Sequence, residues 1–102
     1  MAPHMTLFKM RARPGQRQNV IDHFDRWLRD RRPEAYGFVR VCLISNVKDP
    51  DEFFSYAMFA DKKTYDENSN DPEQHAWYET LRSYLAGEPE WFDGTVERQR
   101  MG

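Results

Sequence analysis

Two central segments of this chain are apolar on both of their faces, and this pattern limits the folds that the chain can adopt. Residues Gly37–Asn46 and Phe53–Ala60 are rich in β-branched and aromatic side chains, and each has the length of a strand. A short turn-forming segment around Pro50 joins them, which predicts an antiparallel hairpin. Strands that are apolar on both faces must be covered from both sides, so the fold has to supply two covers.

The segments before this hairpin predict a strand followed by a helix. Thr6–Arg13 alternates apolar and polar residues with the period of a half-buried strand. Gln16–Arg32 carries apolar residues at spacings of three and four, which is typical of an amphipathic helix, and Pro33 ends it. We leave residues 1–5 outside the predicted domain, 6–99, because they resemble a cloning remnant or a disordered N-terminus.

The segments after the hairpin predict two helices and a last strand. Asp61 can cap a short helix. Asp71 and Pro72 begin a second helix, since aspartate is favoured at the N-cap and proline at the first helical position. We expect Gly87 to end this helix and Trp91–Arg98 to form the final strand.

This order of elements, β-α-β-β-α-β, predicts an α+β domain of the ferredoxin-like type. Such a domain has one antiparallel sheet with both helices on one face, and 102 residues suffice for one domain only. The other sheet face would then be apolar and exposed, which favours aggregation. We therefore predict a homodimer in which a second copy covers it. If Val41 and Met58 face that copy, an aspartate at either position should dissociate or unfold the protein. The alternative is that the strands are simply hydrophobic.

Composition narrows the classes of partner and cofactor. The net charge of −2, without a block of like charge, argues against a nucleic-acid or membrane partner. The single cysteine, Cys42, excludes an internal disulfide and suits a cytoplasmic location. There is no glycine-rich phosphate loop, and the three histidines are scattered, so we predict no cofactor and no metal site.

Two stretches of the chain are similar to a known family. FKMRARPGQRQNVIDHFDRWL (8–28) and SYAMFADKKTYDENSNDPEQHAWYETL (55–81) resemble the antibiotic-biosynthesis-monooxygenase superfamily, in particular its quinol-monooxygenase-like members. The resemblance extends over residues 6–99 and implies a dimeric α+β barrel, in which each subunit holds a pocket between its sheet and its helices. It also implies a cofactor-independent monooxygenase of a phenol, a quinol or a polyketide-like substrate. In such enzymes the protein binds the substrate, deprotonates it and excludes water.

The resemblance also implies which residues form the pocket. The polyketide oxygenases carry an Asn, a Trp and a Tyr where this chain has Ser55, Phe59 and Tyr65. Ser55 and Tyr65 are candidate donors to a substrate oxygen, and Phe59 is a candidate substrate contact. His75 is the candidate base, with a solvent-exposed role as the alternative. Phe59 also replaces the Trp that distorts haem in the haem-degrading members, which makes haem degradation the weaker hypothesis.

Other aromatic residues complete the candidate substrate contacts. Trp27, Trp77 and Tyr78 can either pack the core or stack on a flat ligand. Tyr56 is a further candidate, but it and Ser55 point to opposite faces of one strand, and the sequence does not say which faces the helices. Three functions stay open: a cofactor-free monooxygenase, a non-catalytic dimer that binds a small hydrophobic ligand, and an isomerase or cyclase on the same fold.

Overall fold

Residues 2–100 are described by a computed structural model, in which four strands form one antiparallel sheet of order β2-β3-β1-β4. Met1, part of the segment set aside above, lies outside the described residues. The elements in chain order are β1 (His4–Arg11), α1 (Arg17–Arg26), the π-helical turn η1 (Trp27–Arg31), the 3-10 turn η2 (Arg32–Glu34), β2 (Phe38–Asn46), β3 (Asp49–Phe59), α2 (Lys62–Ser69), α3 (Pro72–Ser83) and β4 (Glu90–Thr95).

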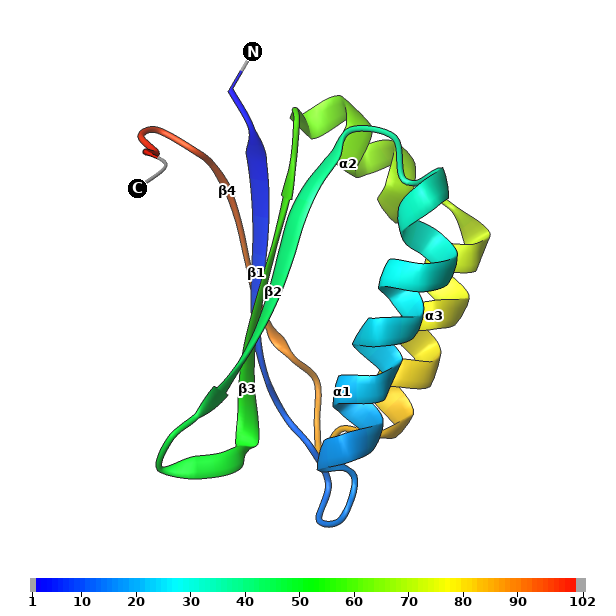
Figure 1. The fold of residues 1–102 in the computed structure, drawn as a ribbon, viewed down its shortest axis with the longest axis vertical. Helices are drawn as coiled ribbons and strands as arrows, with labels where there is room; N and C mark the ends of the chain where they lie inside the picture. The colour runs from blue at the N-terminus through cyan, green and yellow to red at the C-terminus, as the bar shows by residue number, and fades with distance from the viewer. Residues whose placement is uncertain (1, 101–102) are drawn as a thin grey trace.

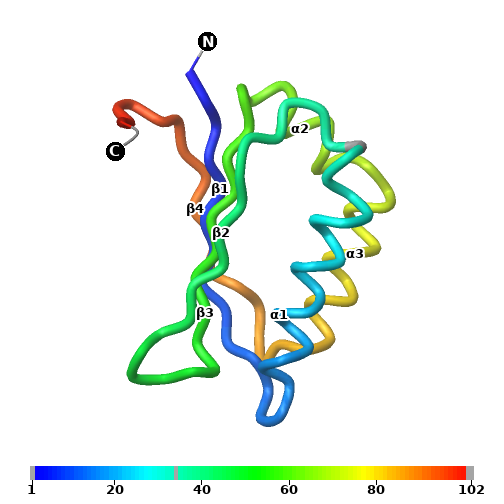
Figure 2. The backbone as a smooth tube through the Cα atoms, in the orientation of Figure 1, coloured from blue at the N-terminus to red at the C-terminus, as the bar shows by residue number. Residues whose placement is uncertain are grey.

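The three α-helices lie on the same face of the sheet, and the other face is bare (Figures 1 and 2). Along β1 the even-numbered residues, such as Phe8 and Met10, are buried toward the helices, whereas Lys9 and Arg11 on the other side are exposed. This alternation is what a sheet covered on one face requires. The predicted α+β, ferredoxin-like fold is confirmed.

The strand boundaries differ from the predicted ones where backbone pairing extends beyond the apolar pattern. β1 begins at His4, two residues earlier than predicted, so His4 and Met5 pair with β3 and β4. β3 begins at Asp49, because only Val47 and Lys48 form the turn and Asn46 already pairs with Asp49. The predicted turn segment, residues 46–52, therefore contains the turn, but from Asp49 onward it is already paired in β3.

The helix starts agree with the predicted caps, and the helix ends do not. The Asp61 and Asp71 carboxylates accept the backbone N–H groups of Thr64 and Glu73, each at 2.9 Å. However, α3 ends at Ser83 rather than near Gly87. The reason lies in the next residues, which pair with the end of β1: the Ala86 N–H donates to the Arg11 carbonyl at 2.8 Å.

The first long helix is also shorter than predicted, because it widens after Arg26. The N–H of Arg32 donates to the Trp27 carbonyl five residues back, which defines a π turn. Both Trp27 and Arg31 are buried. The wider turn thus directs two large side chains, one aromatic and one charged, to the inside of the molecule.

The register of the central hairpin decides which residues reach each sheet face. Val41 lies opposite Ala57 on the helix side, so the expectation that Val41 faces a partner is wrong. The extra residue Val39 between Phe38 and Arg40 shifts the register there. Met58 lies opposite Met5 and Arg40 on the bare face.

Gly37 offers a test of how closely β2 approaches α2. Its φ is +82°, and a Cβ there would clash with the side chain of Thr64. Gly37→Ala should therefore lower the free energy of unfolding by about 2–4 kcal/mol, from backbone strain and overpacking together. Chemical denaturation measures it.

Two matched variants separate the causes of this loss. Gly15 has the same φ but open space around it, so Gly15→Ala should cost only the strain, about 1–2 kcal/mol. Gly87→Ala meets neither problem and should be nearly neutral. Equal losses at Gly15 and Gly37 would contradict the close approach to Thr64.

Candidate substrate pocket

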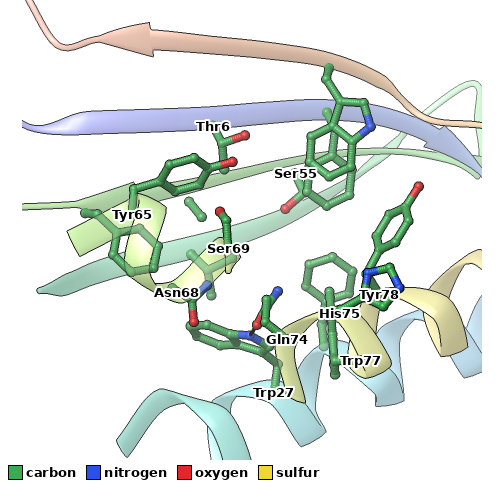
Figure 3. A pocket seen from close by; sticks show the side chains of 16 residues that line it. Thr6, Trp27, Ser55, Tyr65, Asn68, Ser69, Gln74, His75, Trp77 and Tyr78 are labelled. Atoms are coloured by element: carbon green, nitrogen blue, oxygen red, sulfur yellow. Dashed lines mark hydrogen bonds between the residues drawn. The ribbon is translucent and has the colours of Figure 1, made fainter. Parts of the chain in front are cut away.

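A pocket of about 250 Å³ lies between the sheet and the helices. Its walls include residues of two groups of core residues, Phe8 and Phe24 in one and Trp27 and Phe59 in the other. The remaining lining residues are Thr6, Val41, Ser55, Ala57, Tyr65, Asn68, Ser69, Gln74, His75, Trp77, Tyr78 and Trp91. The walls are thus mainly aromatic, with hydroxyl and amide groups placed among the rings (Figure 3).

The sheet wall carries two buried hydroxyl groups without a hydrogen-bond partner. Ser55 is fully buried and Thr6 is 5% exposed, and neither side-chain oxygen is bonded to another described residue. Ser55 lies opposite Phe8 on β1, and Thr6 lies opposite Ala57 on β3, so both belong to the same face. An unpaired buried hydroxyl costs free energy, which a polar atom of a ligand can recover.

This register answers the question of orientation that the sequence leaves open. Ser55 faces the helices and lines the pocket. Tyr56 lies opposite Leu7 and Cys42 on the bare face, away from the pocket. The candidate substrate contact at Tyr56 therefore does not lie with the others.

Tyr65 and Phe59 come together at one end of the pocket. Their ring centroids are 5.7 Å apart in an edge-to-face arrangement. The Tyr65 ring also packs on His4, with centroids 4.4 Å apart, and His4 Nε2 lies 3.4 Å from the Asp93 carboxylate. His4, which lies in the segment left out of the predicted domain, is 7% exposed and packs its ring against that of Tyr65.

The helix wall is organised by Arg31, whose side chain is only 6% exposed. Its guanidinium donates to the Asn68 side-chain oxygen at 3.0 Å and to the Gln74 side-chain oxygen at 3.5 Å. It also forms ion pairs with Asp71 and Glu73, each at 3.3 Å. The buried charge is thus paired, and it joins η1 to the corner between α2 and α3.

Two candidate residues on this wall are fixed by hydrogen bonds. The Trp27 indole N–H donates to Gln74 at 2.7 Å. The Trp77 indole N–H donates to the His23 carbonyl at 3.0 Å, and the His23 ring nitrogen Nε2 lies 2.8 Å from the Trp77 carbonyl. A carbonyl only accepts, so Nε2 of His23 carries a proton and donates. The side chains of His23 and Trp77 therefore each donate to the backbone of the other residue, and their stacked rings have centroids 4.7 Å apart.

The two other candidates on α3 lie nearer the surface. His75 is exposed and forms an ion pair with Glu79 at 3.3 Å, on the rim of the pocket. The Tyr78 hydroxyl donates to Glu88 at 3.2 Å. Burial, followed by the nearby Glu88 carboxylate, raises the pKa of Tyr78, so its phenol stays protonated near neutral pH.

No group of three or more His, Cys, Asp or Glu side chains is placed to hold a metal ion anywhere in residues 2–100. None of the helices in the same range is long and apolar enough to cross a membrane. The groups that the pocket offers to a bound molecule are hydroxyls, amides, aromatic rings and the imidazole of His75.

Among the residues that build the site, the sequence analysis missed His4, Thr6, Arg31, Asn68 and Gln74. The alternation of β1 placed Thr6 on its buried face, which was the available signal. Gln74 carried a signal only for helix capping. A single arginine in a charged helix, such as Arg31, gives no sign that it is buried, because most such residues are solvated.

Comparison with known proteins gives the chain its family. The model of the family described as antibiotic biosynthesis monooxygenase matches residues 3–80, which is more than half of the chain. The chain belongs to this family. The sequence resemblance to the antibiotic-biosynthesis-monooxygenase superfamily is thereby confirmed. No curated protein matches it significantly.

Solved structures share the fold of this chain at low identity. SnoaB, a cofactor-independent oxygenase from Streptomyces nogalater, superposes with a TM-score of 0.85 at 15% identity and 97% coverage of both chains. Rv0793 from Mycobacterium tuberculosis gives 0.82 at 13%, with 98% of this chain and all of that chain covered. A conserved protein from Methanosarcina mazei gives 0.81 at 13%, with 92% of each chain covered.

The contact between His23 and Trp77 predicts a pH-dependent stability. Burial, as the main cause, lowers the pKa of His23 below its ordinary value of 6.5. Below about pH 6.5 the unfolded chain therefore binds a proton that the folded protein does not. The free energy of unfolding should then fall with decreasing pH, by at most about 1.4 kcal/mol per pH unit. Denaturation at pH values between 7.5 and 5 measures this fall.

His23→Gln should remove most of the decrease in this pH range. The matched control is His75→Gln, which replaces the exposed histidine on the rim and should keep it. A wild-type protein whose stability is constant between these pH values would contradict the buried, neutral state of His23.

Proposed function

We propose that this protein is a cofactor-independent monooxygenase that oxidises a flat phenol or quinol in the pocket. The observation that carries the proposal is the pair of unpartnered hydroxyls, Thr6 and Ser55, in a sheet wall that is otherwise apolar and largely aromatic. Such a pocket favours a planar, apolar ligand that has an oxygen atom at its edge. Membership of the family and the shared fold with SnoaB support the reaction type.

The reaction makes limited demands on the protein. A phenol that loses its proton can transfer an electron to O2, and the two radicals then combine. One oxygen atom enters the substrate as a carbonyl group, and the other leaves as water with two hydrogens, one from the phenol hydroxyl and one from the oxidised ring carbon. The substrate supplies all four electrons, so no external reductant is required.

We assign substrate binding and removal of the phenol proton to different lining residues. Ser55 and Tyr65 are the proposed donors that fix a substrate oxygen, and Phe59, Trp27, Trp77 and Tyr78 hold the ring. His75 is the proposed base, because it is the one imidazole among the described lining residues.

The position of His75 also favours a second candidate function, a dimer that binds a hydrophobic ligand without turnover. The imidazole is 72% exposed and already engaged by Glu79. An imidazole that is so exposed on the rim is poorly placed to accept a proton from a substrate held between the sheet and the helices.

Oxygen uptake with a panel of quinols and polycyclic phenols tests the catalytic proposal. Wild-type protein should consume O2 in proportion to product. Ser55→Ala and Tyr65→Phe should each lower kcat/KM by about 10- to 1,000-fold, since each removes one donor to the oxygen that gains charge. Tyr36→Phe, on an 83% exposed tyrosine, is the matched control and should be unchanged.

The response of His75→Ala separates the two candidates further. Loss of a general base should slow turnover by about 10²- to 10⁴-fold. Unchanged turnover would leave oxygenation standing and remove His75 from it. Saturable binding without O2 consumption across the panel would favour the ligand-binding function.

We also propose that the active form is a homodimer joined through the bare sheet face. Apolar side chains extend over all four strands of this face, among them Leu7, Ile44, Phe54 and Phe92. Three of them are 41–68% exposed, which is unusual for large side chains on a small domain. A second copy offers the same surface and buries both.

Light scattering at micromolar concentration tests the dimer. The mass should be about twice the 12.3 kDa of one chain. Phe54→Asp should still fold, because this side chain is already 41% exposed in one chain. It should be monomeric, because a dimer would bury the aspartate charge without a partner of opposite charge. Val47→Asp, in the exposed β2–β3 turn, should remain dimeric. A 12 kDa wild-type particle would refute the dimer.

A further inference from the structure

The helix wall of the pocket contains two side-chain amides, and their orientation is determined by their neighbours. Gln74 and Asn68 both line the pocket. The Gln74 oxygen accepts hydrogen bonds from Trp27 and Arg31, and the Asn68 oxygen accepts one from Arg31. An indole N–H and a guanidinium can only donate, so each amide must present its oxygen to them and turn its nitrogen away.

The nitrogen atoms therefore point toward the pocket. In Figure 3 the nitrogen of each amide lies on the pocket side of its oxygen. Neither nitrogen has a hydrogen-bond partner among residues 2–100. Each NH2 group is a donor that is held in place and still free to bind a ligand.

We infer that Gln74 and Asn68 form a donor wall that binds the acidic oxygen of the substrate and favours its anionic form. Hydrogen bonds to an anion are stronger than those to a neutral oxygen, so donors lower the pKa of the phenol that they bind. This inference deepens the proposed function and rests on it, since it names a phenol that is bound as its phenolate.

Arg31 is the positioning residue of this wall. Without its guanidinium, the Asn68 amide would lose the contact that selects its orientation, and Gln74 would keep only the one to Trp27. The positive charge behind the amides is balanced by Asp71 and Glu73, both partly exposed. The amides, rather than a net charge, therefore provide the selectivity for a phenolate.

The donor wall also offers replacements for two hydrogen-bond donors that the polyketide oxygenases carry on the sheet side of the pocket. The sequence resemblance places an Asn and a Trp of those enzymes at the positions of Ser55 and Phe59. Here the strand supplies only small hydroxyls, and amide donors come from the opposite side, at the α2–α3 corner. A substrate with oxygen atoms at two edges would be bound on both walls.

A binding experiment with 4-nitrophenol and nitrobenzene tests the inference without turnover. The first ligand ionises near neutral pH to a yellow phenolate, and the second lacks the hydroxyl. Tryptophan fluorescence reports binding, because Trp27, Trp77 and Trp91 line the pocket. Wild-type protein should bind the phenolate more tightly than nitrobenzene, and absorbance should show a lowered pKa for the bound phenol.

Gln74→Glu is the decisive variant. It keeps an oxygen for Trp27 and Arg31 but replaces the NH2 donor by a negatively charged acceptor. Phenolate affinity should fall by about 10- to 100-fold, nitrobenzene affinity should change less than about twofold, and the pKa of the bound phenol should rise above that of the free phenol. Asn68→Asp should act in the same direction, and it also replaces Gln74→Glu if that variant fails to fold.

Asn70→Asp is the matched control, since it adds the same charge at an exposed position next to the α2–α3 corner. It should leave both affinities unchanged. The inference is overturned if wild-type protein binds the phenolate no better than nitrobenzene or binds neither. It is also overturned if Gln74→Glu weakens both ligands equally. O2 uptake is measured separately, so phenolate selectivity without oxidation would reject the oxygenase and keep the donor wall.

Discussion

The reciprocal contact between His23 and Trp77 holds α1 and α3 together as one layer. Each side chain donates to the other's backbone carbonyl, and the two rings stack between the helices. Aromatic contacts join this layer to the sheet: Phe24 of α1 packs on Phe8 of β1, and Trp27 packs on Phe38 of β2, with ring centroids 6.3 and 4.9 Å apart. Polar bonds set the spacing between the helices, and aromatic rings set the distance to the sheet.

Local chemistry made much of the fold predictable from the sequence. The caps at Asp61 and Asp71 act within three residues of themselves, so sequence reveals them directly. The ends of α1 and α3 were predicted less well, because they depend on distant partners. The chain leaves α3 early to pair Ala86 with Arg11, which is 75 positions away by residue number.

The site was predictable in part for the same reason. Period-two alternation indicated that Ser55 and Tyr56 occupy opposite faces, but the direction of the helices decides which face is which. Arg31 and Gln74 could not be found, since their roles arise only when η1 meets the α2–α3 corner. Residues whose function depends on a neighbour's orientation leave no pattern along the chain.

The π turn at η1 has a consequence for how this pocket could have arisen. A π turn corresponds to one extra residue accommodated within an α-helix. Because the wider turn absorbs this residue, the helix before it and the chain after it keep nearly the relative orientation that they would have without it. What changes is the spacing: Trp27 and Arg31 are four positions apart with the extra residue and would be three apart without it. A single inserted codon can therefore alter the spacing of two side chains behind a pocket wall while the helix that carries them keeps its orientation.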